Sequence, residues 1–94
     1  MQELAPPEQV FTDPQAVELV RAWLSRDQLL VALQPIDFHD GATRYGIVLA
    51  DVARHVADML YQGFGHPKTA VLSEICRVFI AEMKSDTQAA GGFL

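Results

Sequence analysis

The clearest pattern of apolar and polar positions lies in the second half of the chain. Over residues 45–60, apolar side chains recur at steps of three and four, and polar side chains occupy the complementary positions. This spacing predicts a long amphipathic helix. Asp40 is its expected N-cap, and Gly63, Gly65 and Pro67 together supply the expected stop.

A second amphipathic helix is predicted from about Pro67 to Lys84. Its apolar stripe is formed by Leu72, Ile75, Cys76, Phe79 and Met83, and it is widened by Val71, Val78 and Ile80. A stripe this broad gives the helix more than one side to bury. Cys76 is expected to be a buried, unreactive thiol that behaves as a small apolar side chain.

The region 18–34 fits two patterns. Val17, Val20 and Trp23 have helical spacing, and Asp13 followed by Pro14 resembles the start of a helix. The same region also fits a β-hairpin, and a short helix at about 14–17 before the hairpin satisfies both signals. The choice between helix and strand over 14–24 stays open at this point.

The hairpin explains more of this region, and we predict it. With a two-residue turn at Arg26 and Asp27, apolar residues of the two strands face one another on one side of the hairpin. The expected pairs are Leu24 with Leu29, Ala22 with Val31, and Val20 with Leu33. Because this turn lacks the glycine that a positive φ angle favours, a longer or irregular loop is the alternative.

The two ends of the chain lack regular patterns. Residues 1–15 contain three of the five prolines and predict an extended N-terminal arm, and residues 85–94 predict a flexible C-terminal tail. The expected fold class is therefore α+β: an arm, an antiparallel β-hairpin and two amphipathic helices. We expect a single compact domain over residues 1–84.

A lone hairpin has two unpaired edges and is marginally stable in water. Its second face would carry Trp23 and Leu30, and the wide stripe of the last helix adds Val71 and Val78. These four residues are the candidate surface for a dimer or another partner. We predict a homodimer that completes a four-stranded sheet, and the alternative is a monomer whose arm covers the hairpin.

The composition excludes several classes of function. Half of the 94 residues are hydrophobic, so a folded domain is expected, and the net charge is −5 with only seven scattered basic residues. Nucleic acid is therefore not an expected partner. The apolar stretches are too short to cross a bilayer, and we expect neither a membrane partner nor a signal peptide. A single cysteine favours the cytoplasm.

One stretch is dense in reactive side chains. It contains Asp51, Arg54, His55 and Asp58, which one face of a helix would carry. Helical spacing pairs Asp51 with His55 and Arg54 with Asp58. A carboxylate beside histidine can orient a general base, but pairs of this kind are also ordinary features of a solvated helix.

Catalytic and metal-binding signatures are missing from the sequence. The candidate ligands are His39, His55, His66 and Cys76, with Asp40 and Asp58 as oxygen donors. They do not follow any zinc-binding spacing, and no glycine-rich phosphate loop or nucleophile elbow is present. We therefore expect no metal, no cofactor and no catalytic residue.

Two segments resemble a known family. They read DPQAVELVRAW at 13–23 and YGIVLADVARHVA at 45–57. They are similar to small bacterial proteins known only as a domain of unknown function, with an AVE-x-x-RAW segment and a GI-x-LAD-x-ARHVA helix. The resemblance extends from about Leu4 to Met83, and it differs at 25–28, where the family commonly has a glycine in the turn. Since the family has no assigned activity, the resemblance implies the segmentation and no catalytic residue.

Two functions follow from these patterns. The first is a small interaction or regulatory module that acts through protein–protein contacts. The second is a small ligand-binding domain or enzyme that uses His55 with Asp51 or Asp58.

Overall fold

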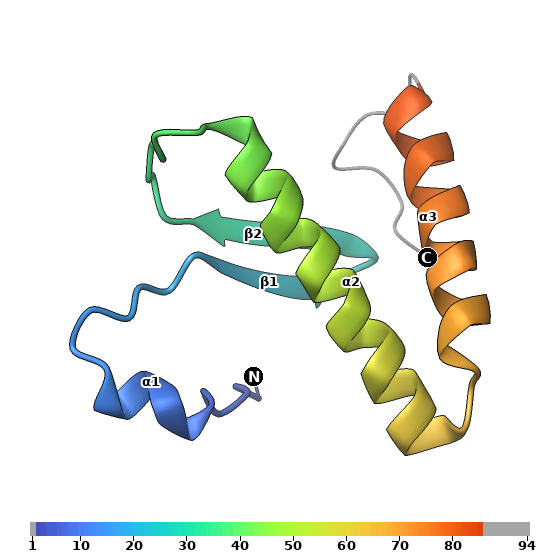
Figure 1. The fold of residues 1–94 in the computed structure, drawn as a ribbon, viewed down its shortest axis with the longest axis horizontal. Coiled ribbons are helices and arrows are strands. Elements are labelled where there is room, and N and C mark those ends of the chain that lie inside the picture. Colours follow the sequence, from blue (N-terminus) through green and yellow to red (C-terminus); the bar gives the residue numbers. More distant parts are fainter. Residues whose placement is uncertain (1, 86–94) are drawn as a thin grey trace. The chain divides into compact units, whose positions relative to one another are not determined.

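The computed structural model describes residues 2–85, which form a β-hairpin followed by helices. These residues divide after Pro35 into two units, an N-terminal unit with the hairpin and a C-terminal unit with a helical pair. The expected α+β class is confirmed. In chain order the elements are α1 (Glu8–Thr12), β1 (Val20–Ser25), β2 (Gln28–Leu33), α2 (Ala42–Phe64) and α3 (Lys68–Lys84) (Figure 1).

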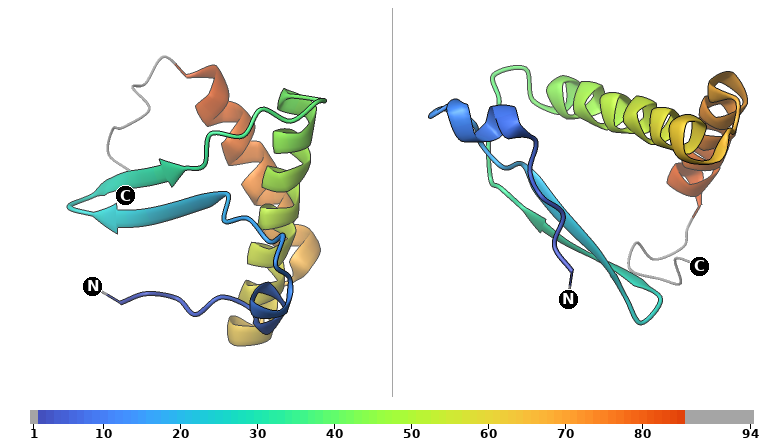
Figure 2. Two further views of the ribbon diagram at one scale, coloured as in Figure 1. Left: turned by 90° about the vertical axis from the view of Figure 1, so that its left-hand side faces the viewer. Right: turned by 90° about the horizontal axis from the view of Figure 1, so that it is seen from below.

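The hairpin forms with the predicted register. Leu24 pairs with Leu29, and two residues further from the turn Ala22 pairs with Val31. The strands lie side by side and antiparallel in both views of Figure 2. The residues of region 18–24 are therefore strand from Val20 onward, because cross-strand pairing of alternate apolar residues outweighs their helical spacing.

The turn of the hairpin has two residues, so the alternative of a longer loop is wrong. Arg26 has a φ angle of 51° and Asp27 a φ angle of 63°. Two successive positive φ angles are typical of a type I′ turn, whose twist matches that of the strands. Here the strand pairing holds two non-glycine residues in the left-handed region.

The N-terminal arm differs from the prediction in two places. Residues Glu8–Thr12 form the short helix α1, with Pro7 in the N-cap position. The alternative of a short helix at 14–17 is wrong. Instead, the Asp13 carboxylate accepts a hydrogen bond from the Gln15 amide (2.9 Å), and this local turn satisfies the backbone.

Helix α2 begins at Ala42, with Gly41 in the N-cap position. The expected cap by Asp40 is therefore wrong, and its carboxylate instead lies 3.3 Å from the Arg44 guanidinium. At the other end, Gly65 adopts a φ angle of 75° and its amide donates to the Tyr61 carbonyl (2.9 Å). This left-handed residue ends the helix, whereas Gly63 lies inside it.

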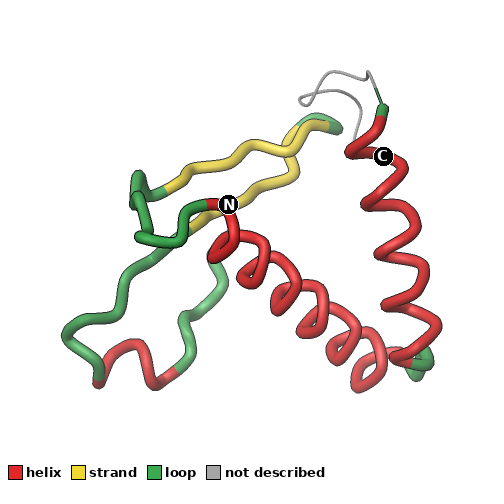
Figure 3. Tube along the Cα trace, turned by 45° about the horizontal axis from the view of Figure 1, so that its top comes forward, coloured by secondary structure: helices red, strands yellow, loops and turns green. Residues whose placement is uncertain are grey.

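Helix α3 has the predicted extent and packs against α2. The two helices are joined at residues 65–67, and they diverge from that turn in Figures 1 and 3. Ala57 of α2 is 1% exposed and is the one buried residue of the described chain. Cys76, expected to be buried, is exposed, because the stripe of α3 is broader than its contact with one helix.

The extent of the domain stays a prediction. The C-terminal tail predicted over 85–94 lies outside the described residues, apart from Ser85. The single domain over 1–84 and the completion of a four-stranded sheet by a second copy stay predictions as well.

Candidate functional site

The polar cluster predicted from the sequence lies on α2. Asp51, Arg54, His55 and Asp58 are all exposed side chains of this helix. They line a shallow hollow of about 390 Å³ together with Ala57, Lys68 and Leu72. The hollow therefore combines a face of α2 with the first turns of α3.

The ion pairs in this hollow differ from those expected. Arg54 donates to the Asp51 carboxylate at 2.6 Å, three residues away rather than four. Asp58 pairs with Lys68, whose ammonium nitrogen lies 2.7 Å from its Oδ1 atom. The predicted pairs of Asp51 with His55 and of Arg54 with Asp58 are therefore wrong. Each carboxylate takes the cation that reaches it in better geometry.

Lys68 is the member of the hollow that the sequence analysis missed. It is the first residue of α3, ten positions beyond Asp58, so no helical spacing relates the two. Its ammonium also lies 5.1 Å from the centre of the Tyr61 ring. The only sequence signal was its position directly after Pro67, which marks the start of a helix but not its partner.

The ion pair of Lys68 and Asp58 holds both groups in their charged forms. The hydrogen bond from Lys68 lowers the pKa of the Asp58 carboxyl below its ordinary value, and the nearby charge of His55 adds slightly to this. The same bond raises the pKa of Lys68. Neither group is therefore suited to exchange a proton at neutral pH.

A second hollow of about 650 Å³ is almost entirely apolar. Val71 and Val78, two of the predicted contact residues, both line it. The other lining residues are Leu60, His66, Pro67, Ala70, Glu74, Ile75 and Phe79. The structure thus places the two valines on one continuous apolar surface of the helical unit.

The hairpin brings the other two predicted contact residues together. Trp23 and Leu30 are directly opposite each other in the register, on the face that also carries Arg21. Trp23 is half-buried and Leu30 is 48% exposed. The opposite face of the hairpin is apolar and exposed as well, with Val20, Leu24, Leu29, Val31 and Leu33.

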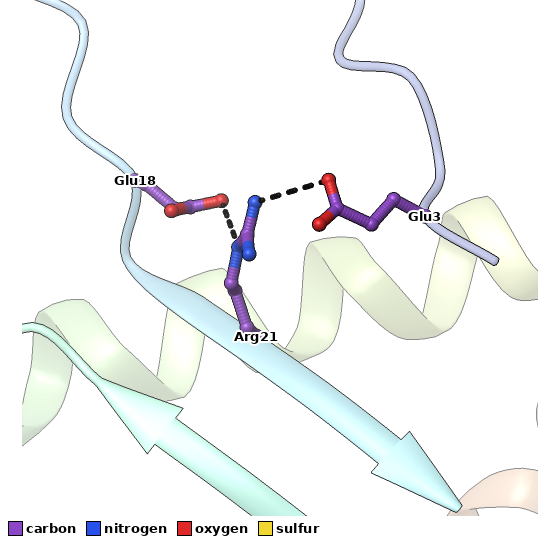
Figure 4. Close-up of polar contacts among 3 residues, drawn as sticks. All are labelled: Glu3, Glu18 and Arg21. Atoms are coloured by element: carbon purple, nitrogen blue, oxygen red, sulfur yellow. Dashed lines mark hydrogen bonds and ion pairs between the residues drawn. The ribbon is translucent and has the colours of Figure 1, made fainter. Parts of the chain in front are cut away.

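The N-terminal arm is held beside β1 by charge. The Arg21 guanidinium binds the Glu18 carboxylate at 2.9 Å and lies 3.9 Å from a carboxylate oxygen of Glu3 in the arm (Figure 4). All three side chains are exposed, so each contact contributes little to stability. These contacts nevertheless place the carboxylates of Glu3 and Glu18 next to Arg21 of β1.

Residues 2–85 contain no cluster suited to a metal ion. Within this range, no three His, Cys, Asp or Glu side chains lie close enough together to hold one. No helix in this part of the chain combines the length and apolar character that crossing a bilayer requires.

The hairpin and the helical pair define a small α+β protein. The chain belongs to the family described as "Domain of unknown function (DUF5076)", which matches residues 3–87. The predicted membership of an uncharacterised family is thereby confirmed, and no curated protein matches the chain.

A solved structure from Rhodopseudomonas palustrus CGA009 is similar to this chain. It is described as a "putative pyruvate dehydrogenase" from that photosynthetic bacterium. The TM-score is 0.76 at 26% sequence identity, and the match covers 97% of this chain and 92% of the other. The similarity therefore extends over nearly the whole of both chains.

Proposed function

We propose that this domain is a small cytoplasmic protein–protein interaction module that works as a homodimer. The observation that carries the proposal is the exposure of its apolar side chains. Within residues 2–85 only Ala57 is buried, whereas both faces of the hairpin and the apolar hollow of the helices are open. Contiguous apolar surface of this kind is characteristic of contact surfaces between proteins.

The hairpin unit supports self-association independently. Its sheet has two strands only, and a two-stranded sheet needs further strands or a packed helix for stability. Most soluble oligomers are symmetric, so one self-complementary surface is enough to supply these strands. Trp23, Leu30, Val71 and Val78 are the residues we assign to the contact surfaces.

The mass of the full chain in solution tests this proposal. Sedimentation velocity at micromolar concentration should give twice the 10.4 kDa of one chain. A mass of one chain up to high micromolar concentration would contradict the homodimer. Val78→Asp places a charge in the apolar hollow and should lower the dimer fraction, whereas Ser73→Asp, outside the hollow on the same helix, should leave it unchanged.

A second candidate function is binding of a small ligand in the polar hollow of α2 and α3. This hollow holds His55 beside the two ion pairs, and cations line it from both helices. The description of the similar structure makes pyruvate, a small carboxylate, the appropriate probe. In this function His55 would contact the ligand, with Asp51 or Asp58 placing it.

Nuclear magnetic resonance tests the second function. Addition of pyruvate should shift the imidazole signals of His55 while leaving those of His39 unchanged, because His39 does not line the hollow. His55→Gln should remove saturable binding. Equal or absent shifts at both histidines would contradict a pyruvate site in this hollow.

A further inference from the structure

The register of the hairpin determines which backbone amides and carbonyls point to its two outer edges. The Gln34 amide donates to the Leu19 carbonyl (3.0 Å), so residues 19 and 34 form a hydrogen-bonded pair. Hydrogen-bonded and non-hydrogen-bonded pairs alternate along an antiparallel ladder. Val31 and its opposite residue Ala22 therefore form a non-hydrogen-bonded pair, and their amides point away from each other to the two outer edges.

The outer edge of β1 is protected by charge. Arg21 lies in this strand, and its guanidinium is bracketed by Glu18 and by Glu3 of the N-terminal arm (Figure 4). The contact of Arg21 with Glu3 places part of the arm beside this strand. Charged residues and covering segments are devices by which proteins keep an edge strand from pairing with another chain.

Within residues 2–85, the outer edge of β2 has no such charged protection. The strand reads QLLVAL over Gln28–Leu33, with no charged residue and no proline. All six residues are exposed. Long, apolar and uncharged edges of this kind are the ones that pair with another strand.

The sequence of β2 is symmetric about Val31 on the apolar face. Leu29 precedes Val31 by two residues and Leu33 follows it by two, so all three point to the same side and have outward amides. An antiparallel pair of two such strands brings leucine opposite leucine and valine opposite valine. A two-fold axis requires this self-complementarity.

We propose that β2 pairs antiparallel with β2 of a second copy, with Val31 opposite the partner's Val31 on the two-fold axis. Leu29 then faces the partner's Leu33, and their outward amides and carbonyls complete the ladder. This inference rests on the proposed homodimer and adds the outer edge of β2 to its contact surfaces. The product is a four-stranded sheet in order β1-β2-β2-β1.

This pairing also concentrates the apolar surface. The side chains of Val20, Leu24, Leu29, Val31 and Leu33 lie on one face of each hairpin. A two-fold axis perpendicular to the sheet leaves the apolar faces of both hairpins on the same side of the four-stranded sheet. The apolar residues of the two copies therefore form one continuous apolar face. A second copy of this chain is thus the partner that fits the edge of β2. The experiments below distinguish it from a strand of another protein.

Cysteine cross-linking tests the contact. In a Cys76→Ser chain, which lacks the exposed native thiol, Val31→Cys should form a disulfide-linked dimer on oxidation with copper phenanthroline. Opposite residues of a hydrogen-bonded antiparallel pair have Cα atoms roughly 5.5 Å apart, within the range for a disulfide. The matched control is Ala22→Cys, opposite Val31 on the hairpin but next to the other edge. It should stay monomeric on a non-reducing gel.

Proline substitution gives a second test that needs no oxidation. Val31→Pro removes one amide that points to the outer edge of β2 and none inside the hairpin. It should reduce the mass in solution to one chain, whereas Ala22→Pro, which removes the equivalent amide of β1, should keep two chains. Circular dichroism checks that each proline variant is folded. If one of them is not, the cysteine variants alone test the pairing of β2.

The outcomes separate this inference from the proposed function. Linking of the Val31→Cys chain alone supports β2 pairing. Three results overturn it while the homodimer stands, provided that the wild type has a two-chain mass. They are cross-linking of the Ala22→Cys chain alone, equal cross-linking of both chains, and cross-linking of neither chain. A one-chain mass for the wild type, at every concentration, overturns both the homodimer and the pairing of β2 with a second copy.

Discussion

The ammonium group of Lys68, at the first residue of α3, lies 2.7 Å from the Oδ1 atom of Asp58 on α2. This ion pair joins the two helices of the C-terminal unit, and both side chains are about half exposed, at 49% and 54%. Salt therefore screens it, and its effect is best measured through titration rather than through total stability.

Removal of the Lys68 charge should raise the pKa of Asp58. In the wild type the bond to Lys68 lowers this pKa, so its stabilising contribution is present above the ordinary carboxyl pKa and is lost as the pH falls through the lowered value. Carboxyl resonances should titrate at higher pH in Lys68→Met. Lys84→Met, on the same helix but outside this pair, should leave the Asp58 midpoint unchanged, and equal midpoints in Lys68→Met and wild type would contradict the pair.

The opposite sign holds for Lys68. The bond to Asp58 raises its pKa, so the contribution is present below the ordinary lysine value and is lost as the pH rises through the raised one. In Asp58→Asn the Lys68 ammonium should lose its proton at lower pH than in the wild type, which NMR of the lysine side chains can follow. An unchanged or higher midpoint would argue against the contact.

Enlargement of Ala57 should destabilise the helical pair. This residue is 1% exposed where α2 packs against α3, and overpacking of such a position costs about 1–3 kcal/mol. Ala57→Leu should therefore lower the free energy of unfolding measured in urea. Ala50→Leu changes the same residue type at an exposed position of α2 and should have little effect. Similar values for the two variants would contradict this packing.

Two glycines near the end of α2 should respond to alanine with opposite signs. Gly65 has a φ angle of 75°, a conformation that costs an ordinary residue about 1–2 kcal/mol, so Gly65→Ala should destabilise the protein. Gly63 lies inside the helix, and a Cβ atom added there would meet no side chain and no other segment of the described chain within 4 Å, so Gly63→Ala should stabilise it by about 1 kcal/mol. Thermal unfolding measures both, and a shared sign would contradict the observed helix end.

Glycine in the hairpin turn should stabilise the hairpin. Arg26 has a φ angle of 51°, which is strained for a residue with a side chain. In Arg26→Gly the loss of this strain outweighs the greater backbone entropy of unfolded glycine, so the free energy of unfolding should rise by on the order of 0.5 kcal/mol. Ser25→Gly, one residue earlier within β1, should instead cost about 0.5–1 kcal/mol. Chemical denaturation compares the two, and destabilisation by Arg26→Gly would contradict the type I′ turn.

The regular elements could be predicted from the sequence because they depend on neighbouring residues. Alternating apolar residues around Arg26 and Asp27 determined the register of the hairpin, and glycine at position 65 determined the end of α2. Local competition explains the errors. Asp13 forms a turn instead of starting a helix, and Gly41 rather than Asp40 takes the N-cap of α2, because side chains with several local partners do not show from sequence which one they take.

The sequence by itself thus determined the hairpin, its register, the two long helices and the face that carries His55. Only the tertiary structure decided that Lys68 meets Asp58 and that Cys76 is exposed. The physical reason is that strand and helix patterns follow backbone periodicity. Ion-pair partners and burial depend instead on how α3 turns back against α2 after Gly65, which brings together residues that no fixed spacing relates.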